Sequence, residues 1–142
     1  MAGLTFPDVN VWLATLHFEH VHHRIAKSWW EADDSDAICF TRITQISLLR
    51  LLTTPAVMNQ KPLSMSAAWS AYDRLFEDSR VDYVTEPVEV EAKFRTMTES
   101  GISSPKVWAD AWLLAMAECY GGRVVTFDQH MAAQREICLV LG

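Results

Sequence analysis

Hydrophobic and polar residues alternate along the chain with two periods, one typical of strands and the other typical of helices. Short apolar runs bounded by turn-forming residues predict strands over residues 4–6, 37–41, 81–85, 123–127 and 137–141. Apolar positions that recur every three or four residues predict helices over residues 10–16, 22–32, 43–52, 64–76, 87–99 and 105–120. Strands and helices thus alternate almost throughout, which favours an α/β sandwich with a mostly parallel central sheet flanked by helices.

Residues that favour helix ends mark several of the predicted boundaries. Ser64 stands at the cap position of the helix that runs to residue 76. Pro87 opens the next helix in this interpretation. Ser104 followed by Pro105 predicts the start of the last long helix, because proline is favoured at the first helical position.

The composition is that of one globular domain spanning residues 1–142. Half of the residues are hydrophobic, 21% are charged, and glycine and proline number five each, so we expect no linker. No apolar run approaches the roughly 18–20 residues of a membrane span, and the first residues lack the features of a signal peptide. Cys39, Cys119 and Cys138 lie in apolar segments without a CxxC spacing, which is typical of free thiols in a reducing compartment. We therefore expect a cytoplasmic protein with no membrane segment.

The formal net charge of −6 argues by itself against a nucleic-acid partner. Proteins that grip phosphates are usually basic, because binding releases counterions from the nucleic acid. The objection weakens if some of the acids hold a divalent cation, or if a basic partner segment covers them.

Two aspartates lie where the chain leaves predicted parallel strands. Asp8 follows the first strand and Asp128 follows the fourth. Ligands of open parallel sheets bind beyond the carboxyl ends of the strands, so both side chains are candidates for a common site. Each can also be explained as a helix cap, since aspartate is a preferred capping residue.

Asp110 interrupts an otherwise apolar face of the predicted helix 105–120. A desolvated carboxylate without a partner costs several kcal/mol, so a compensating cation is expected. That cation is either a bound metal ion or Lys106, one turn earlier; we favour the metal.

Three carboxylates from separate parts of the chain form a hard-oxygen site suited to Mg²⁺ or Mn²⁺. Such an ion lowers the pKa of a bound water and stabilises charge on a leaving phosphate oxygen, which favours phosphoryl chemistry. Asn10 and Thr126 can orient a ligand or water in the same site, although a buried strand threonine is an equally good reading of Thr126.

Other polar and aromatic residues are open to two interpretations. His17, His20, His22 and His23 have no Cys or Glu at a recognised zinc spacing, so a solvated segment is favoured over a metal site. Trp108 and Trp112 share a helix face, where core or interface packing is favoured over stacking on a base.

Five basic residues lie on segments that lead toward the acids: Arg24, Lys27, Arg42, Arg50 and Lys106. Arg42 and Lys106 are the best candidates for RNA binding, against the alternative of a solvated helix face.

Three motifs give the chain a resemblance to the PIN-domain ribonucleases, and in particular to the VapC toxins of bacterial toxin–antitoxin pairs. They read PDVNVWLA at residues 7–14, DAWLLA at 110–115 and TFDQHM at 126–131. The resemblance implies a PIN-like three-layer fold. It also implies that Asp8 and Asp110 are the principal metal ligands and that Asp128 completes the cluster.

One departure from the family concerns the helix after the second strand, where a glutamate is usual. Gln45 is interpreted as the residue at that position. A neutral amide adds no negative charge, so either weaker metal binding or loss of a second metal site is expected, with activity retained.

The resemblance further implies an endoribonuclease that cleaves RNA, often tRNA or rRNA. It implies a homodimer and a VapB-like antitoxin whose C-terminal segment enters the active-site groove. A basic antitoxin tail suits an acidic toxin, with an arginine approaching the carboxylates.

Two rival functions remain. An aspartyl-phosphate enzyme would use Asp8 as a phosphoacceptor, but phosphatases of that kind carry an acid where this chain has Asn10. A catalytically silent PIN-like module that binds RNA or a partner is kept open by Gln45.

Overall fold

The computed structural model describes residues 3–134 and 137–142. Five parallel strands form one sheet in the order β3-β2-β1-β4-β5. The strands are β1 (Leu4–Pro7), β2 (Ala37–Phe40), β3 (Val81–Tyr83), β4 (Arg123–Thr126) and β5 (Cys138–Val140). The helices are α1 (Val9–Leu16), α2 (His23–Ala32), α3 (Arg42–Leu52), α4 (Met65–Leu75), α5 (Val90–Thr98), α6 (Val107–Cys119) and α7 (Gln129–Gln134). The predicted α/β class and parallel sheet are confirmed.

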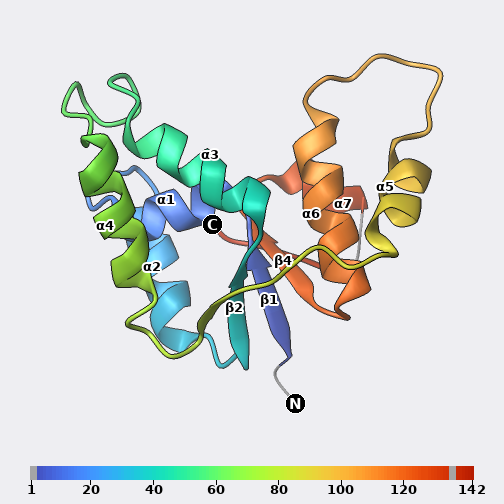
Figure 1. Cartoon of the computed structure of the whole chain (residues 1–142), viewed down its shortest axis with the longest axis horizontal. Helices are drawn as coiled ribbons and strands as arrows, with labels where there is room; N and C mark the ends of the chain where they lie inside the picture. The colour runs from blue at the N-terminus through green and yellow to red at the C-terminus, as the bar shows by residue number, and fades with distance from the viewer. Residues whose placement is uncertain (1–2, 135–136) are drawn as a thin grey trace.

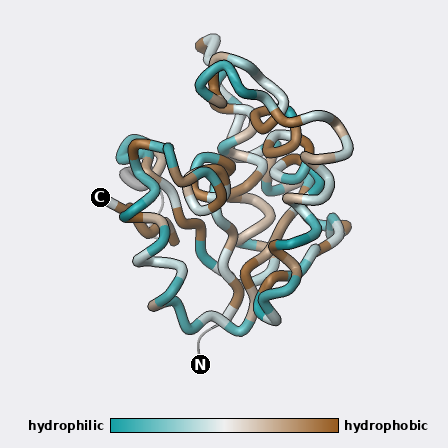
Figure 2. The backbone as a smooth tube through the Cα atoms, turned by 90° about the vertical axis from the view of Figure 1, so that its left-hand side faces the viewer, coloured by the Kyte–Doolittle hydropathy of each residue, from teal (hydrophilic) through white to brown (hydrophobic). Residues whose placement is uncertain are grey.

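The sheet separates two hydrophobic cores, so the molecule has three layers. Helices α1 to α4 gather on one side and α5 to α7 on the other (Figure 1). Side chains alternate along each strand: Ile38 and Phe40 enter the core under α1–α4, whereas Cys39 between them enters the core under α5–α7. Hydrophobic segments, brown in Figure 2, accordingly run through the middle of the molecule.

The strand order places a topological switch point between β1 and β4. From β1 the chain continues to β2 and β3 on one side, while β4 and β5 lie on the other. Pro7 pairs in register with Val125, so the carboxyl ends of these two strands are adjacent. Ligands of open parallel sheets bind at this location.

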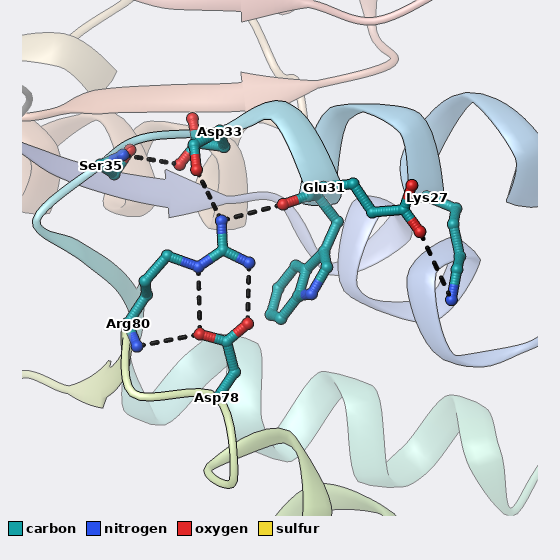
Figure 3. Close-up of polar contacts among 7 residues, drawn as sticks. Lys27, Glu31, Asp33, Ser35, Asp78 and Arg80 are labelled. Carbon is teal, nitrogen blue, oxygen red and sulfur yellow. Dashed lines mark hydrogen bonds and ion pairs between the residues drawn. The ribbon is translucent and has the colours of Figure 1, made fainter.

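The amino ends of the strands meet at the opposite edge, in a network of paired charges (Figure 3). The Arg80 guanidinium binds the Asp78 carboxylate through two nitrogens, at 3.0 and 2.7 Å, and donates to the carbonyl of Asp33 at 2.6 Å. The Asp33 carboxylate, whose side chain is only 1% exposed, accepts from Arg123 at 2.7 Å. This edge joins the segments before β2 and β3 to the first residue of β4.

Two helices begin after the predicted proline, α5 by three residues and α6 by two. Helix α5 begins at Val90 rather than Pro87, and α6 begins at Val107 rather than Pro105. In each case the proline lies in a single turn before the helix, closed by a backbone bond from Val90 to Pro87 at 3.2 Å or from Val107 to Ser104 at 3.1 Å. Ser104 therefore does not cap α6. Helix α7 was not predicted, because residues 129–134 carry no clear apolar period.

The other predicted boundaries agree with the structure to within two residues. Ser64 caps α4 by accepting from the N–H of Ala67 at 3.1 Å. Helix α6 ends before Gly121, whose positive φ of 63° favours glycine. At Gly122 a Cβ atom would come within 2.6 Å of the Leu4 carbonyl, so β1 and the α6–β4 turn approach more closely than a larger residue allows.

None of the described helices is long and apolar enough to cross a membrane.

Candidate active site

Asp8, Thr126 and Asp128 are joined by hydrogen bonds at the carboxyl ends of β1 and β4. Asp8 caps α1, with Oδ1 accepting from the N–H of Val9 at 2.7 Å. The buried Thr126 hydroxyl donates to Asp8 Oδ2 at 3.2 Å and accepts from the N–H of Asp128 at 2.9 Å. Asp128 Oδ1 then accepts from two backbone N–H groups at the start of α7. Both carboxylates are thus capping residues that also face the same edge.

Asp110 reaches this edge from the first turn of α6. The pKa of its carboxyl is raised to about 6, first by burial and then by the negative charges of Asp8 and Asp128. Burial also raises the pKa of Asp8, against the lowering effect of its hydrogen bonds from Val9 and Thr126. Neighbouring carboxylates thus oppose the ionisation of Asp8 and Asp110, so a positive charge bound at this site would be favoured.

Lys106, the alternative partner for Asp110, forms no ion pair with it among the described residues. Among the ion pairs of residues 3–134 and 137–142, none joins Lys106 to Asp110 or involves Asp8 or Asp128. Among the described residues, therefore, no ion pair compensates the negative charge of the three carboxylates, although His130 lowers the pKa of Asp110 in part.

The three carboxylates line one open cleft of about 390 Å³. Its walls come from α1, α3, α6 and the segment after β4. They consist of Asp8, Val9, Asn10, Ser47, Arg50, Ala109, Asp110, Phe127 and Asp128. Asn10 thus lies in the cleft, as an exposed residue in the first turn of α1.

Ser47 and Arg50 are cleft residues that the sequence reasoning did not place there. Ser47 also lines a smaller hollow with Asp8 and Asp110. Arg50 was one of five basic candidates and is the basic residue in the cleft lining. The two residues are three positions apart on α3 and therefore share a helix face, which is the sequence feature that could have identified them together.

Gln45 does not belong to this lining. Its side chain is 7% exposed, and Oε1 accepts from Arg42 at 2.6 Å. It also hydrogen-bonds Tyr72 of α4. The interpretation of Gln45 as the counterpart of the family glutamate therefore conflicts with its position, and Ser47 lies where such a glutamate would reach the carboxylates.

The two predicted RNA-binding residues lie outside the cleft lining. Arg42 is exposed at the start of α3, with its guanidinium 4.9 Å from the centre of the Tyr83 ring. Lys106 is exposed immediately before α6. Both are near helix starts that surround the carboxyl edge of the sheet.

The histidine segment makes local contacts. His22 stacks on Phe127 with ring centres 4.5 Å apart, and His23 Nδ1 bonds the carbonyl of Ala14 at 2.7 Å. Burial, and then the neighbouring histidines, lower the pKa of His20. Because Phe127 also lines the cleft, this segment borders the carboxylate site.

The donor set fits Mg²⁺ or Mn²⁺ in chemistry. Carboxylate oxygens are the ligands that these hard ions prefer, and Mg²⁺ usually takes only one or two carboxylates and keeps several waters. In the part of the chain that the structure describes, no group of three or more His, Cys, Asp and Glu side chains is close enough to hold one ion. Asp8 and Asp128 each hold one carboxylate oxygen on a backbone N–H donor. The residues therefore suit an ion held by few direct ligands and by water.

Comparisons with known proteins agree with this architecture. The sequence profile of the PIN domain family matches residues 5–137. The chain is 39% identical to ribonuclease VapC41 of Mycobacterium tuberculosis over 126 residues, which cover 85% of this chain and 86% of that protein. It is 32% identical to ribonuclease VapC44 of the same species, over 88% of this chain and 86% of the relative.

Solved structures show the same fold. The crystal structure of Mycobacterium tuberculosis VapC20, described as a toxin that cleaves the sarcin–ricin loop, superposes with a TM-score of 0.67 at 16% identity, over 92% of this chain and 94% of that one. A toxin–antitoxin complex from Klebsiella pneumoniae superposes with a TM-score of 0.63, also at 16% identity, over 96% of each chain.

Proposed function

The chain belongs to the PIN domain family and, within it, to the VapC ribonucleases, and from this premise we propose that it is a divalent-metal-dependent endoribonuclease acting as a toxin. The observation that carries the proposal is the convergence of Asp8, Asp110 and Asp128 on one cleft at the switch point of the sheet. Burial and the neighbouring carboxylates raise the pKa of Asp110, so a bound Mg²⁺ or Mn²⁺ ion would offset the cost of its charge.

A bound ion would supply an activated water and offset negative charge at the scissile phosphate. Asp8 and Asp110 are the proposed principal ligands, with Asp128 completing the cluster. Thr126 fixes the orientation of Asp8 by donating to Oδ2, and it links Asp8 to Asp128 through its hydroxyl. Asn10 offers an amide at the mouth of the cleft that can orient water or substrate.

RNA would approach along the basic residues around the cleft. Arg50 lies in the cleft lining and is the nearest candidate for a phosphate contact. Arg42 and Lys106 lie farther out, where they can bind phosphates on either side of the cleavage site. The proposed substrate class is a structured RNA, tRNA or rRNA, in keeping with VapC20, which cleaves the sarcin–ricin loop.

The proposed partner is a VapB-like antitoxin whose basic C-terminal segment enters the cleft. The support is a solved toxin–antitoxin complex with the same fold, together with the net charge of −6. A homodimer and a cytoplasmic location belong to the same proposal.

Cleavage assays with metal and with carboxylate variants test the proposal. The purified protein should cut RNA with Mg²⁺ or Mn²⁺ and stop when EDTA is added. Asp8→Asn and Asp110→Asn should each abolish cleavage. Asparagine caps helices as well as aspartate does, so Asp8→Asn removes the charge while the cap of α1 is retained.

The matched control is Asp73→Asn, which changes an exposed aspartate on α4, remote from the cleft. It should cleave as the parent does, and circular dichroism should show the same fold for all three variants. Parental cleavage by both cleft variants would overturn the proposal.

A catalytically silent module that binds RNA or a partner is the second candidate. It is favoured by the separation of the potential ligands in the described residues. Such a module would shift RNA in a gel equally well with Mg²⁺ and with EDTA and would leave the RNA intact in both. Metal-dependent appearance of new RNA ends decides between the two functions.

A further inference from the structure

A second hollow, of about 640 Å³, lies between α5 and α6. It shares no lining residue with the carboxylate cleft. Phe94, Trp108 and Trp112 form its aromatic wall, and Glu86, Glu91 and Glu99 bring carboxylates to it. We propose that this groove binds a basic segment of a polypeptide partner, with an arginine or lysine side chain seated against Trp108 and Phe94.

The aromatic wall leaves ring surface accessible. Trp108 is 56% exposed, which is unusual for the largest apolar side chain. Phe94 meets Trp108 at 5.9 Å with the ring planes tilted by 57°, and meets Trp112 at 5.4 Å with the planes at 82°. Neither indole stacks face to face on Phe94, and the exposure of Trp108 shows that much of its indole remains accessible. An accessible ring face attracts a cation that approaches within about 6 Å.

The charges around the wall select a cation over a phosphate. Three glutamates line the hollow against one arginine, Arg95, and Arg95 is already paired with Glu91 at 3.0 Å. Glu86 and Glu99 belong to no ion pair among the described residues. An RNA strand would bring its phosphates toward this net negative charge, whereas an arginine or lysine would gain from both the rings and the carboxylates.

The hollow adjoins a second space that a longer segment of peptide could also occupy. A neighbouring space of about 400 Å³ shares Thr98 and Trp108 with it and adds apolar surface from Met97 and Ile102. Ile102 is 78% exposed. A peptide with a basic residue followed by an apolar one would therefore fill both spaces, the cation at Trp108 and the apolar side chain at Ile102.

Fluorescence anisotropy with a short labelled peptide, in which arginines alternate with leucines, tests this inference. The inference does not depend on ribonuclease activity, so the titration is made in EDTA. The parent should bind the peptide, and the same peptide with glutamine in place of arginine should bind about tenfold more weakly. Trp108→Ala should weaken binding by about tenfold as well. The double variant Glu86→Gln/Glu99→Gln should weaken binding and reduce its dependence on salt.

Three controls separate this groove from other binding modes. Trp69→Ala removes an exposed tryptophan from α4 and should leave the affinity unchanged. If Trp108→Ala unfolds the protein, the surface double variant still decides the question. Binding that is lost with Asp8→Asn/Asp110→Asn but retained with Trp108→Ala would place the peptide at the carboxylate cleft and overturn the inference. Displacement of the peptide by oligouridylate at the Trp108 groove would identify an RNA surface, and no peptide binding by the parent would likewise refute the proposal.

Discussion

At the amino-terminal edge of the sheet, Asp33 and Asp78 each meet an arginine at 2.7 Å. At the opposite edge, Asp8, Asp110 and Asp128 line a cleft, and none of them belongs to an ion pair among the described residues. Both edges gather acids from segments far apart in the sequence. They differ in whether the chain itself supplies the positive charge.

The paired edge compensates its charges with donors from several segments. The Arg80 guanidinium binds Asp78 through two nitrogens, donates to the carbonyls of Trp30 and Asp33, and lies 5.0 Å from the centre of the Trp30 ring (Figure 3). The pKa of Asp78 is lowered, chiefly by its hydrogen bond from Arg80. At the cleft, by contrast, the carboxyl pKa values of Asp8 and Asp110 are raised.

The pKa of Asp78 is lowered whereas those of Asp8 and Asp110 are raised, which suits different roles for the two edges. A lowered carboxyl pKa means that folding favours the charged form, so the charge stabilises the fold. A raised pKa means that the folded protein tolerates the charge at a cost, which a ligand can recover. The paired edge therefore holds the strands together, and the unpaired edge is the place where a cation or a basic partner gains most.

The largest expected effect is a loss of stability from Arg123→Met, which removes an ion pair at the amino-terminal edge. The change leaves the Asp33 carboxylate, 1% exposed, with only the N–H of Ser35 as a side-chain partner among the described contacts. Removing Arg123 should cost about 2 kcal/mol, because the buried Asp33 carboxylate loses its ion pair and keeps only the attraction of the nearby Arg80. Thermal unfolding should show a fall of several degrees in Tm.

Its matched control is Lys27→Met, which breaks an exposed pair with Glu31 at 3.9 Å. Both side chains of that pair are more than half exposed, so the free energy of unfolding should change by less than about 0.5 kcal/mol. Equal losses from the two variants would contradict the structural role of the paired edge.

The second prediction concerns the carboxylate cleft, where the charge of Asp110 should lower stability. In EDTA at pH 7.5, Asp110→Asn should stabilise the fold by about 1.5 kcal/mol, because it removes a destabilising charge from a partly solvent-screened site. The pKa of Asp110 is raised to about 6 in the folded protein, so the native state binds its proton more tightly than the unfolded chain does. The parent's stability should then fall as pH rises from about 4 to about 6.

The gain from Asp110→Asn should consequently be small near pH 4, where the parent carboxyl is protonated in the folded state and about half protonated in the unfolded chain. Denaturant unfolding at pH 4 and at pH 7.5 measures the difference. A variant that is less stable than the parent at pH 7.5 would show that Asp110 already has a compensating partner.

The positions of the aspartates that follow strands could be predicted from the sequence. Asp8 and Asp128 were predicted at one edge because parallel strands end on the same side, and their place at the switch point required only the strand order. The starts of α5 and α6 were not predictable from Pro87 and Pro105 alone. Proline suits both a first helical turn and an isolated turn before a helix, and the surrounding packing selects between them.

The position of Gln45 was missed for a different reason. Its chemical likeness to glutamate suggested a place in the site, but its spacing from buried leucines on the same helix indicates a buried position. Gln45 shares a stripe with Leu48 and Leu52, at intervals of three and seven residues, and all three are buried. Ser47 lies about 200° away around the helix, on the face that borders the cleft. The helical period was thus a better guide to the site than residue type.

The smallest expected effect is a change in metal affinity. It is tested by adding a carboxylate at position 47 or at position 45 of α3. Ser47→Glu places a negative charge in the cleft lining, and at roughly 6 Å in water such a charge attracts a divalent ion by about 1 kcal/mol, or roughly fivefold in affinity. Gln45→Glu instead places its charge beside Arg42, which donates to the present amide at 2.6 Å. We expect an ion pair there and an Mg²⁺ requirement within about twofold of the parent. Half-saturating Mg²⁺ concentrations for RNA cleavage by the two variants measure the contrast, and a larger improvement from Gln45→Glu would show that position 45, and not 47, reaches the ion.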